Sequence, residues 1–127
     1  RPMSIIFKED NPTFEKTLKK LAKRYRTLAE DLCLLKKIIV LFHINNQYSN
    51  GDLGIFEITG HSSQIFKIYK ARKFACRSLP KTGCMSGLRL IYAFNIQMQI
   101  ITFIEIYYKG DQQHEDSNKI KDFLKNS

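Results

Sequence analysis

The stretch SGLRLIYAF, residues 86–94, predicts a β-strand with an arginine in its interior. It carries a large apolar side chain at every second position: Leu88, Leu90, Tyr92 and Phe94. That period is typical of a strand with one buried face, so Arg89 points to the opposite face. A guanidinium inside a strand is unusual unless another group interacts with it. The rest of the sequence indicates which group interacts with Arg89.

Length and composition indicate one globular domain. The chain has 127 residues, of which 43% are hydrophobic, enough to bury a core. Its longest apolar run, IIVLF at 38–42, is far shorter than the roughly 18 residues of a membrane span. We expect no signal peptide, no membrane association and a cytoplasmic location. We expect the domain to cover 3–126, with Arg1 and Pro2 left out of the fold.

The first third of the chain predicts two helices. Pro12 suits a first helical turn, and Asn11 or Thr13 can cap it. Apolar side chains follow in steps of four and three along one stripe: Phe14, Leu18, Leu21, Tyr25, Leu28, Leu32, Leu35 and Ile39. One long helix would also satisfy this stripe, but TLAE at 27–30 has the pattern of a capping box. We therefore predict helices over 13–25 and 28–43, folded back as a hairpin.

Three consecutive strands follow later in the chain. QIFKIYKARKFAC at 64–76 alternates apolar and polar residues until the pattern weakens near Ala71, where a bulge is expected. The strand that contains Arg89 comes next, and QIITFIEIYYK at 99–109 is the last. A polar, basic loop at 77–87 and NIQM at 95–98 connect them, and we predict an antiparallel meander.

The remaining segments complete the predicted fold. MSIIF at 3–7 can form a short first strand, and 45–63 is a polar loop with an extended piece at 55–58. HEDSNKIKDFLKN at 114–126 predicts a short amphipathic helix. The expected class is α+β, in the order β-α-α-β-β-β-α. The helical hairpin packs on one face of a small antiparallel sheet, and the last helix covers the other face only in part.

Charge is the strongest compositional signal. Lys+Arg number 21 against 12 Asp+Glu, which gives a net charge of +9 and a pI near 9.6. Between Ile58 and Ile104 no residue is acidic, while this stretch holds basic ones at Lys67, Lys70, Arg72, Lys73, Arg77, Lys81 and Arg89. Such a field attracts nucleic acid, an acidic protein or an anionic membrane, and a merely solvated basic surface is the alternative.

Arg89 itself has two interpretations. If the hairpin turns around Gln97, Arg89 lies opposite Glu105, in a cross-strand ion pair that contributes about 0.2–1 kcal/mol. In the second interpretation, Arg89 shares its face with Tyr107, Lys109 and basic residues of the preceding strand. The resulting concavity suits phosphate, because arginine offers a bidentate fork, lysine a point charge and tyrosine a stacking surface.

No metal or cofactor site is expected. The chain has three cysteines, Cys33, Cys76 and Cys84, in no metal-ligand spacing. We expect free thiols in a reducing compartment, with a Cys76–Cys84 bridge as the alternative. The histidines are isolated: His43, His61 and His114. His114 is a minor candidate for acid or base, and Glu115 with Asp116 is expected to cap the last helix.

The sequence resembles the RelE/ParE superfamily of toxins from bacterial toxin–antitoxin pairs. The helical stretch FEKTLKKLAKRYRTLAEDL is similar to the amino-terminal half of these proteins. The segments IFKIYKARKF, SGLRLIYAF, ITFIEIYYKGD and IKDFL are similar to their sheet and last helix. The resemblance covers nearly the whole chain, roughly 5–125. SGLRLIYAF is its most specific element, because members repeatedly carry a Gly-x-Arg-[LV]-[IV]-Tyr strand there.

The resemblance to RelE implies a metal-independent endoribonuclease that cuts mRNA in the ribosomal A site and is bound by an acidic antitoxin. The ribose 2′-OH attacks the adjacent phosphorus and the 5′-oxygen leaves, which requires a base, cations on the phosphoryl oxygens and an acid. The implied catalytic residues are Arg89 as phosphate contact, Lys109, Lys70 and Tyr107. The implied RNA-binding residues are Lys67, Arg72, Lys73, Arg77 and Lys81.

The carboxy terminus departs from the family pattern. The best-studied members place a catalytic Tyr or His–Tyr there, whereas this chain ends in DFLKNS, with no aromatic residue after Phe123. Tyr107, Tyr108 or His114 would have to substitute. The ParE branch shares the scaffold but poisons DNA gyrase and cleaves no RNA. The alternatives are therefore a non-enzymatic toxin or inactive relative that binds an antitoxin, and an unrelated basic RNA- or membrane-surface protein.

Overall fold

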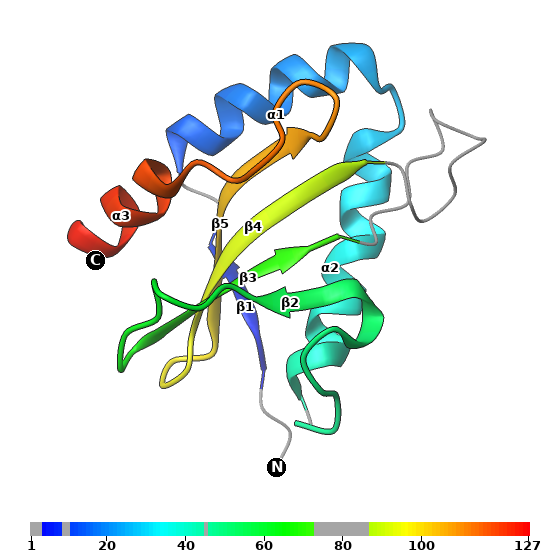
Figure 1. Ribbon diagram of the computed structural model, residues 1–127. Coiled ribbons are helices and arrows are strands. Elements are labelled where there is room, and N and C mark those ends of the chain that lie inside the picture. Colours follow the sequence, from blue (N-terminus) through cyan, green and yellow to red (C-terminus); the bar gives the residue numbers. More distant parts are fainter. Residues whose placement is uncertain (1–3, 9–10, 45, 73–86) are drawn as a thin grey trace.

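The computed structural model describes residues 4–8, 11–44, 46–72 and 87–127. Its strands form one sheet in the order β1-β5-β4-β3-β2. They are β1 (Ile6–Lys8), β2 (Ile55–Glu57), β3 (Phe66–Ala71), β4 (Leu88–Asn95) and β5 (Ile100–Tyr108). The helices are α1 (Pro12–Arg24), α2 (Leu28–Ile44), the 3₁₀ turn η1 (Asp52–Gly54) and α3 (Ser117–Lys125). The α+β class is confirmed (Figure 1).

The antiparallel meander β3-β4-β5 is confirmed, and two short strands extend it. β1 pairs in parallel with β5, so the sheet is mixed rather than purely antiparallel. β2 pairs antiparallel with β3 and forms the opposite edge of the sheet. The expected order β-α-α-β-β-β-α therefore lacked one strand. Three residues are too few to show a period of two, so the sequence indicated only an extended piece there.

The two long helices begin and end close to the predicted positions. The side chain of Asn11 accepts hydrogen bonds from the backbone N–H groups of Thr13 and Phe14, as expected for a cap before Pro12. The chain leaves the helix at Tyr25 and starts α2 at Leu28. In Figure 1, α1 runs across one end of the sheet and α2 descends along it. The two helices therefore do not fold back along each other as a hairpin would.

Both faces of the central strand are buried. On one face, α1 and α2 pack against Leu88, Leu90, Tyr92 and Phe94. On the other face, Ile120 of α3 packs in a second cluster with apolar side chains of the sheet: Ile68, Ile91, Ala93, Ile104 and Tyr107. The last helix was expected to cover this face only in part, and within β4 every residue from Leu88 to Phe94 is buried.

The register between β4 and β5 differs from the predicted one. Arg89 lies opposite Tyr107, not Glu105, and Ile91 lies opposite Glu105. The connecting turn displaces the pairing by one residue, and a bulge beside Ile91 displaces it by another. The two displacements sum to two residues, so Glu105 keeps the same face as Arg89. Within the described part of this segment, the bulge expected near Ala71 is not seen, since Phe66–Ala71 pairs with β4 in one regular register.

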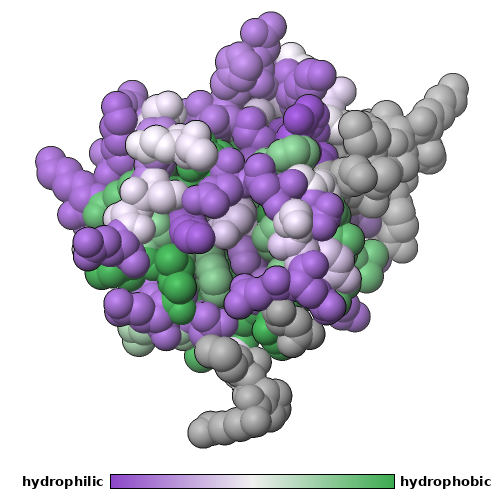
Figure 2. Space-filling view, turned by 60° about the horizontal axis from the view of Figure 1, so that its bottom comes forward, coloured by the Kyte–Doolittle hydropathy of each residue, from purple (hydrophilic) through white to green (hydrophobic). Residues whose placement is uncertain are grey.

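Large apolar side chains are exposed at the end of the sheet where β4 turns into β5. Met98 in the turn is 65% exposed, and Ile65 and Ile96 beside it are 44% and 37% exposed. Figure 2 brings this end of the molecule forward and shows apolar surface among hydrophilic side chains. Adjacent exposed apolar residues commonly mark a contact with another protein. In the part of the chain that is described, no helix is long and apolar enough to cross a membrane.

Candidate functional site

The sheet register brings basic, acidic and aromatic side chains together on the face that carries Arg89. Lys70 of β3 lies beside Ile91, which lies beside Glu105. Two residues further along the strands, Arg89 lies between Arg72 and Tyr107. Arg89 pairs with Tyr107, and its Nη1 donates a hydrogen bond to the carbonyl oxygen of Arg72 at 3.3 Å. These residues, which were predicted to line a concavity, are neighbours on one face of the sheet. We call Lys70, Arg72, Arg89 and Tyr107 the Arg89 cluster.

Arg89 is buried, and no carboxylate among the described residues compensates its charge. Its side chain is 7% exposed, and its Nη1 donates to the carbonyl oxygens of Leu88, at 3.1 Å, and Arg72. Burial and then the charge of Arg72 lower the pKa of Arg89, whereas Tyr107 raises it. Within the described residues Arg89 forms no ion pair. A buried guanidinium next to another cation is electrostatically under-compensated, which favours the binding of an anion.

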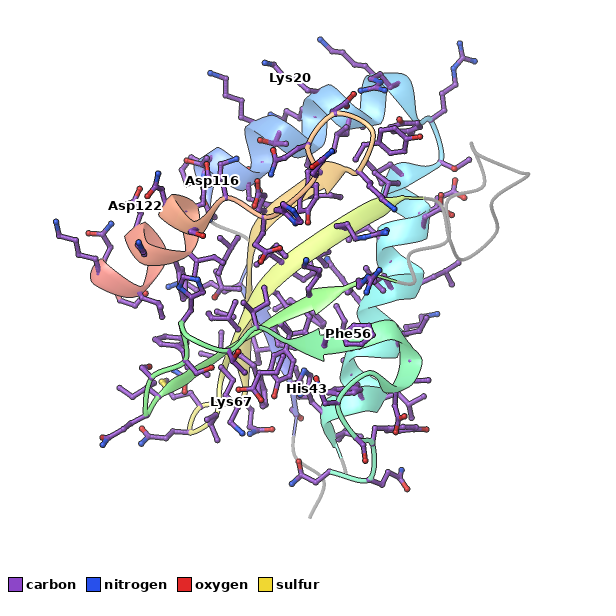
Figure 3. All side chains as sticks on the ribbon, viewed as in Figure 1. Lys20, His43, Phe56, Lys67, Asp116 and Asp122 are labelled. Carbon is purple, nitrogen blue, oxygen red and sulfur yellow. The ribbon has the colours of Figure 1, made fainter. Side chains whose placement is uncertain are left out.

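Glu105 holds the chain around α3 and does not pair with Arg89. It is 1% exposed, and its Oε1 accepts a hydrogen bond from the backbone N–H of Asp116 at 2.8 Å. Its Oε2 accepts from the side chain of Gln112 at 2.8 Å and lies 3.6 Å from Nζ of Lys119. The first interpretation of Arg89, a cross-strand ion pair with Glu105, is therefore excluded. Glu105 instead fastens β5 to the first turn of α3, whose cap is Asp116 (Figure 3).

The carboxylate of Glu115 forms an ion pair with Lys70. Its Oε1 lies 2.6 Å from Nζ of Lys70, and both side chains are about 20% exposed, at 21% and 20%. Burial alone would raise the pKa of Glu115, but the hydrogen bond from Lys70, a backbone hydrogen bond and nearby positive charge together lower it. Glu115 is therefore a carboxylate at neutral pH. The sequence indicated only that Glu115 and Asp116 begin a helix, and Asp116 does so.

Tyr107 is a proton donor rather than a base. It is 5% exposed, and burial, followed by the charges of Glu115 and Glu105, raises its pKa to about 12. The positive charges of Arg89 and Arg72 oppose that shift. The phenol consequently keeps its proton at neutral pH. It can donate a hydrogen bond to an oxygen that develops negative charge beside Arg89.

The other predicted residues do not all join the cluster. Lys67 pairs with Phe94, so it lies on the face covered by α1 and α2. Lys67 and Lys70 are three positions apart in a regular strand, which puts them on opposite faces. Lys109 follows β5, with its backbone N–H bonded to the carbonyl oxygen of Gly87. Cys76 and Cys84, with the candidates Lys73, Arg77 and Lys81, lie outside the described residues.

Two contacts around the Arg89 cluster were not predicted from the sequence. The guanidinium carbon of Arg72 lies 5.4 Å from the ring centroid of Phe56, so β2 supports the cluster through a cation–π contact. Gly87 has φ near +90°, and a Cβ there would lie 3.0 Å from the Tyr108 ring. Glycine is thus required two positions before Arg89. In the part of the chain that is described, no cluster of His, Cys, Asp or Glu could hold a metal ion.

Comparison with known proteins gives a structural match. The sequence matches no family model and no curated protein. The structure is similar to a chain in the crystal structure of the archaeal RelE–RelB complex from Pyrococcus horikoshii OT3, with a TM-score of 0.54 and 16% identity. The alignment covers 85% of this chain and 98% of that chain. The chain has a RelE-like fold. At this identity the match confirms the fold expected from the SGLRLIYAF strand, and the activity is a separate question.

Proposed function

We propose that this protein is the toxin of a toxin–antitoxin pair and cuts mRNA on the ribosome. The observation that carries the proposal is the buried Arg89 guanidinium, which has no carboxylate partner among the described residues and lies beside Arg72 and Tyr107. A scissile phosphate supplies the anion that this group lacks. The RelE-like fold supports the proposal because the similar chain comes from a RelE–RelB complex.

The Arg89 cluster has groups for two of the three tasks in cleavage by a 2′-OH. Arg89 and Lys70 neutralise the phosphoryl oxygens as the 2′-oxygen attacks and negative charge develops. The protonated Tyr107 gives its proton to the leaving 5′-oxygen, which departs as a hydroxyl, and the proton of the attacking 2′-OH passes to water. The products are a 2′,3′-cyclic phosphate on one fragment and a 5′-hydroxyl on the other. Incubating the protein with mRNA-programmed ribosomes and mapping the new ends tests this reaction.

One observation favours the second candidate function, a non-enzymatic RelE-like toxin. Lys70 is already bound by Glu115, which leaves one cation fewer for a phosphate. If the wild-type protein leaves ribosome-bound mRNA intact yet still arrests growth, the non-enzymatic candidate replaces the first.

Substitution of Glu115 by glutamine should strengthen the binding of single-stranded RNA by roughly five-fold, because it frees the Lys70 ammonium at a cost of about 1 kcal/mol of ion pairing. Fluorescence anisotropy of a labelled oligonucleotide at low salt measures the change. Glu15→Gln is the matched control, since Glu15 is exposed on α1 and the change in net charge is the same. Equal affinities of the two variants would mean that RNA does not reach Lys70.

An acidic antitoxin segment should bind this protein with an affinity that falls as salt rises. The net charge of +9 makes attraction between opposite charges part of the binding free energy, and dissolved ions screen it. The exposed Met98, Ile65 and Ile96 add an apolar contact that salt does not weaken. Titration calorimetry at 50 mM and 500 mM salt separates the two contributions. An affinity that is unchanged by salt would contradict the charge-based account.

A further inference from the structure

A pocket lies on the other side of the sheet from the Arg89 cluster. It has a volume of about 230 Å³ and is formed by the end of α2, the segment that follows it, and strands β2 and β3. Its lining includes His43, Tyr48, Glu57, Lys67 and Tyr69. Lys67 and Tyr69 point to the face covered by the long helices, because they pair with Phe94 and Tyr92. No step proposed for mRNA cleavage uses this pocket.

His43 is held in one orientation at the base of this pocket. Its Nε2 lies 2.7 Å from the hydroxyl of Tyr92, and its ring stacks on Phe94 with the centroids 4.3 Å apart. The ring of Tyr69 meets it edge-on at 4.7 Å. Its Nδ1 has no hydrogen-bond partner among the described residues and is not a fully enclosed atom. The accessible edge of the ring therefore opens on the pocket that His43 lines.

The buried tyrosine decides which nitrogen of His43 carries the proton. Tyr92 is fully buried, and burial raises its pKa well above the usual value, so its hydroxyl keeps the hydrogen. That hydrogen would be buried without an acceptor unless it is donated to Nε2 of His43. The neutral imidazole then carries its own hydrogen on Nδ1. The pocket consequently contains a fixed N–H donor that needs no positive charge on the ring.

The remaining lining groups complement that donor. Lys67 is exposed, and after burial its charge is the second cause that lowers the pKa of His43. Tyr48 stacks on Phe42, with the ring planes 17° apart, and presents an aromatic surface. The backbone N–H of Glu57 donates to Oδ1 of Asn50 at 2.7 Å, which fixes the loop beside the pocket. In Figure 3, His43 and Lys67 lie at the same end of the sheet.

We propose that this pocket binds one nucleotide, with its phosphate between Lys67 and the Nδ1–H of His43 and its base against Tyr48. A lysine ammonium and a neutral N–H donor are typical phosphate ligands, and an aromatic face accepts any base by stacking. The Glu57 carboxylate can accept a hydrogen bond from an exocyclic amino group. The volume is below the about 300–1,000 Å³ of usual small-molecule sites, so the pocket excludes a dinucleotide cofactor and leaves part of a single bound nucleotide in solvent.

Two sources share this chemistry: a free nucleotide and an unstacked nucleotide of single-stranded RNA. NMR titration of the wild-type protein with adenosine 5′-monophosphate and with a six-residue oligoadenylate distinguishes them. Binding is read at the ring protons of His43, so that phosphate bound at the Arg89 cluster does not count. Tighter binding of the oligonucleotide, by tenfold or more, identifies RNA as the source. Equal or tighter binding of the mononucleotide identifies the free nucleotide.

Lys67→Met should weaken either probe at His43 by at least tenfold, the loss expected when one charge-assisted hydrogen bond is removed. Lys67 is exposed, so this variant should fold normally. Lys37→Met removes the same charge from an exposed position of α2 and should leave the affinity within twofold of the wild type. Two outcomes overturn the proposal: no shift at His43 with either probe at millimolar concentration, or equal affinities in the two variants. Neither depends on whether the protein cleaves mRNA.

Discussion

Replacing Arg89 with methionine should lower the rate of mRNA cleavage on programmed ribosomes by about 10²–10³-fold, equivalent to about 3–4 kcal/mol of transition-state stabilisation. The guanidinium is fixed by the carbonyl oxygens of Leu88 and Arg72, so it is aimed before the substrate arrives. Methionine is similar in length but carries no charge. The measurement is the single-turnover rate, with enzyme in excess over programmed ribosomes.

The same substitution should leave the protein folded. Removing a buried cation that has no described carboxylate partner should change the free energy of unfolding by no more than about 1 kcal/mol. Circular dichroism and urea unfolding check this. Arg26→Met is the matched control, because Arg26 is exposed between α1 and α2 and carries the same charge. Arg89 would be excluded from the site if a folded Arg89→Met protein cleaved as fast as Arg26→Met.

Acidification should destabilise the protein by about 3 kcal/mol through His43 alone, between pH 7 and pH 4. His43 is buried with its Nε2 at the Tyr92 hydroxyl, and burial, then the charge of Lys67, lowers its pKa to about 4. The unfolded chain binds this proton near pH 6.5, so it holds more protons than the folded chain between the two values. The stabilising contribution is therefore complete above pH 6.5 and is lost as the pH falls to 4.

Urea unfolding at several pH values measures this effect. His43→Gln should remove most of the pH dependence over that interval, because glutamine does not titrate and can still bond to Tyr92. His114→Gln is the control, since His114 is exposed and should retain the dependence. Equal pH dependence in the two variants would show that other groups cause the acid sensitivity.

The sequence predicted the parts of the fold that rest on long periodic patterns. The stripe from Phe14 to Ile39 spans enough turns to define two helices, and the alternation from Leu88 to Phe94 defines a strand and the side that Arg89 takes. The strands β1 and β2 have three residues each. Such short strands are set by tertiary pairing, and their local pattern carries little information.

The candidate site was predicted less completely, because its contacts depend on register. The connecting turn and one bulge shift the register, so Glu105 does not lie opposite Arg89. Its carboxylate instead accepts a hydrogen bond from Asp116 at the start of α3. The contact between Lys70 and Glu115 joins residues far apart in the chain, so no local sequence pattern predicts it. The side that Lys67 takes, by contrast, could have been predicted. Its distance of three positions from Lys70 in one strand already places the two lysines on opposite faces.

The most direct test of the central claim is to map the ends of an mRNA after incubation of the wild-type protein with ribosomes programmed on it. The account predicts a new 5′-hydroxyl end at the codon in the A site, with a 2′,3′-cyclic phosphate on the upstream fragment, and no such ends with Arg89→Met. An mRNA that remains intact at every protein concentration, while the wild-type protein is folded and toxic to growing cells, would contradict it.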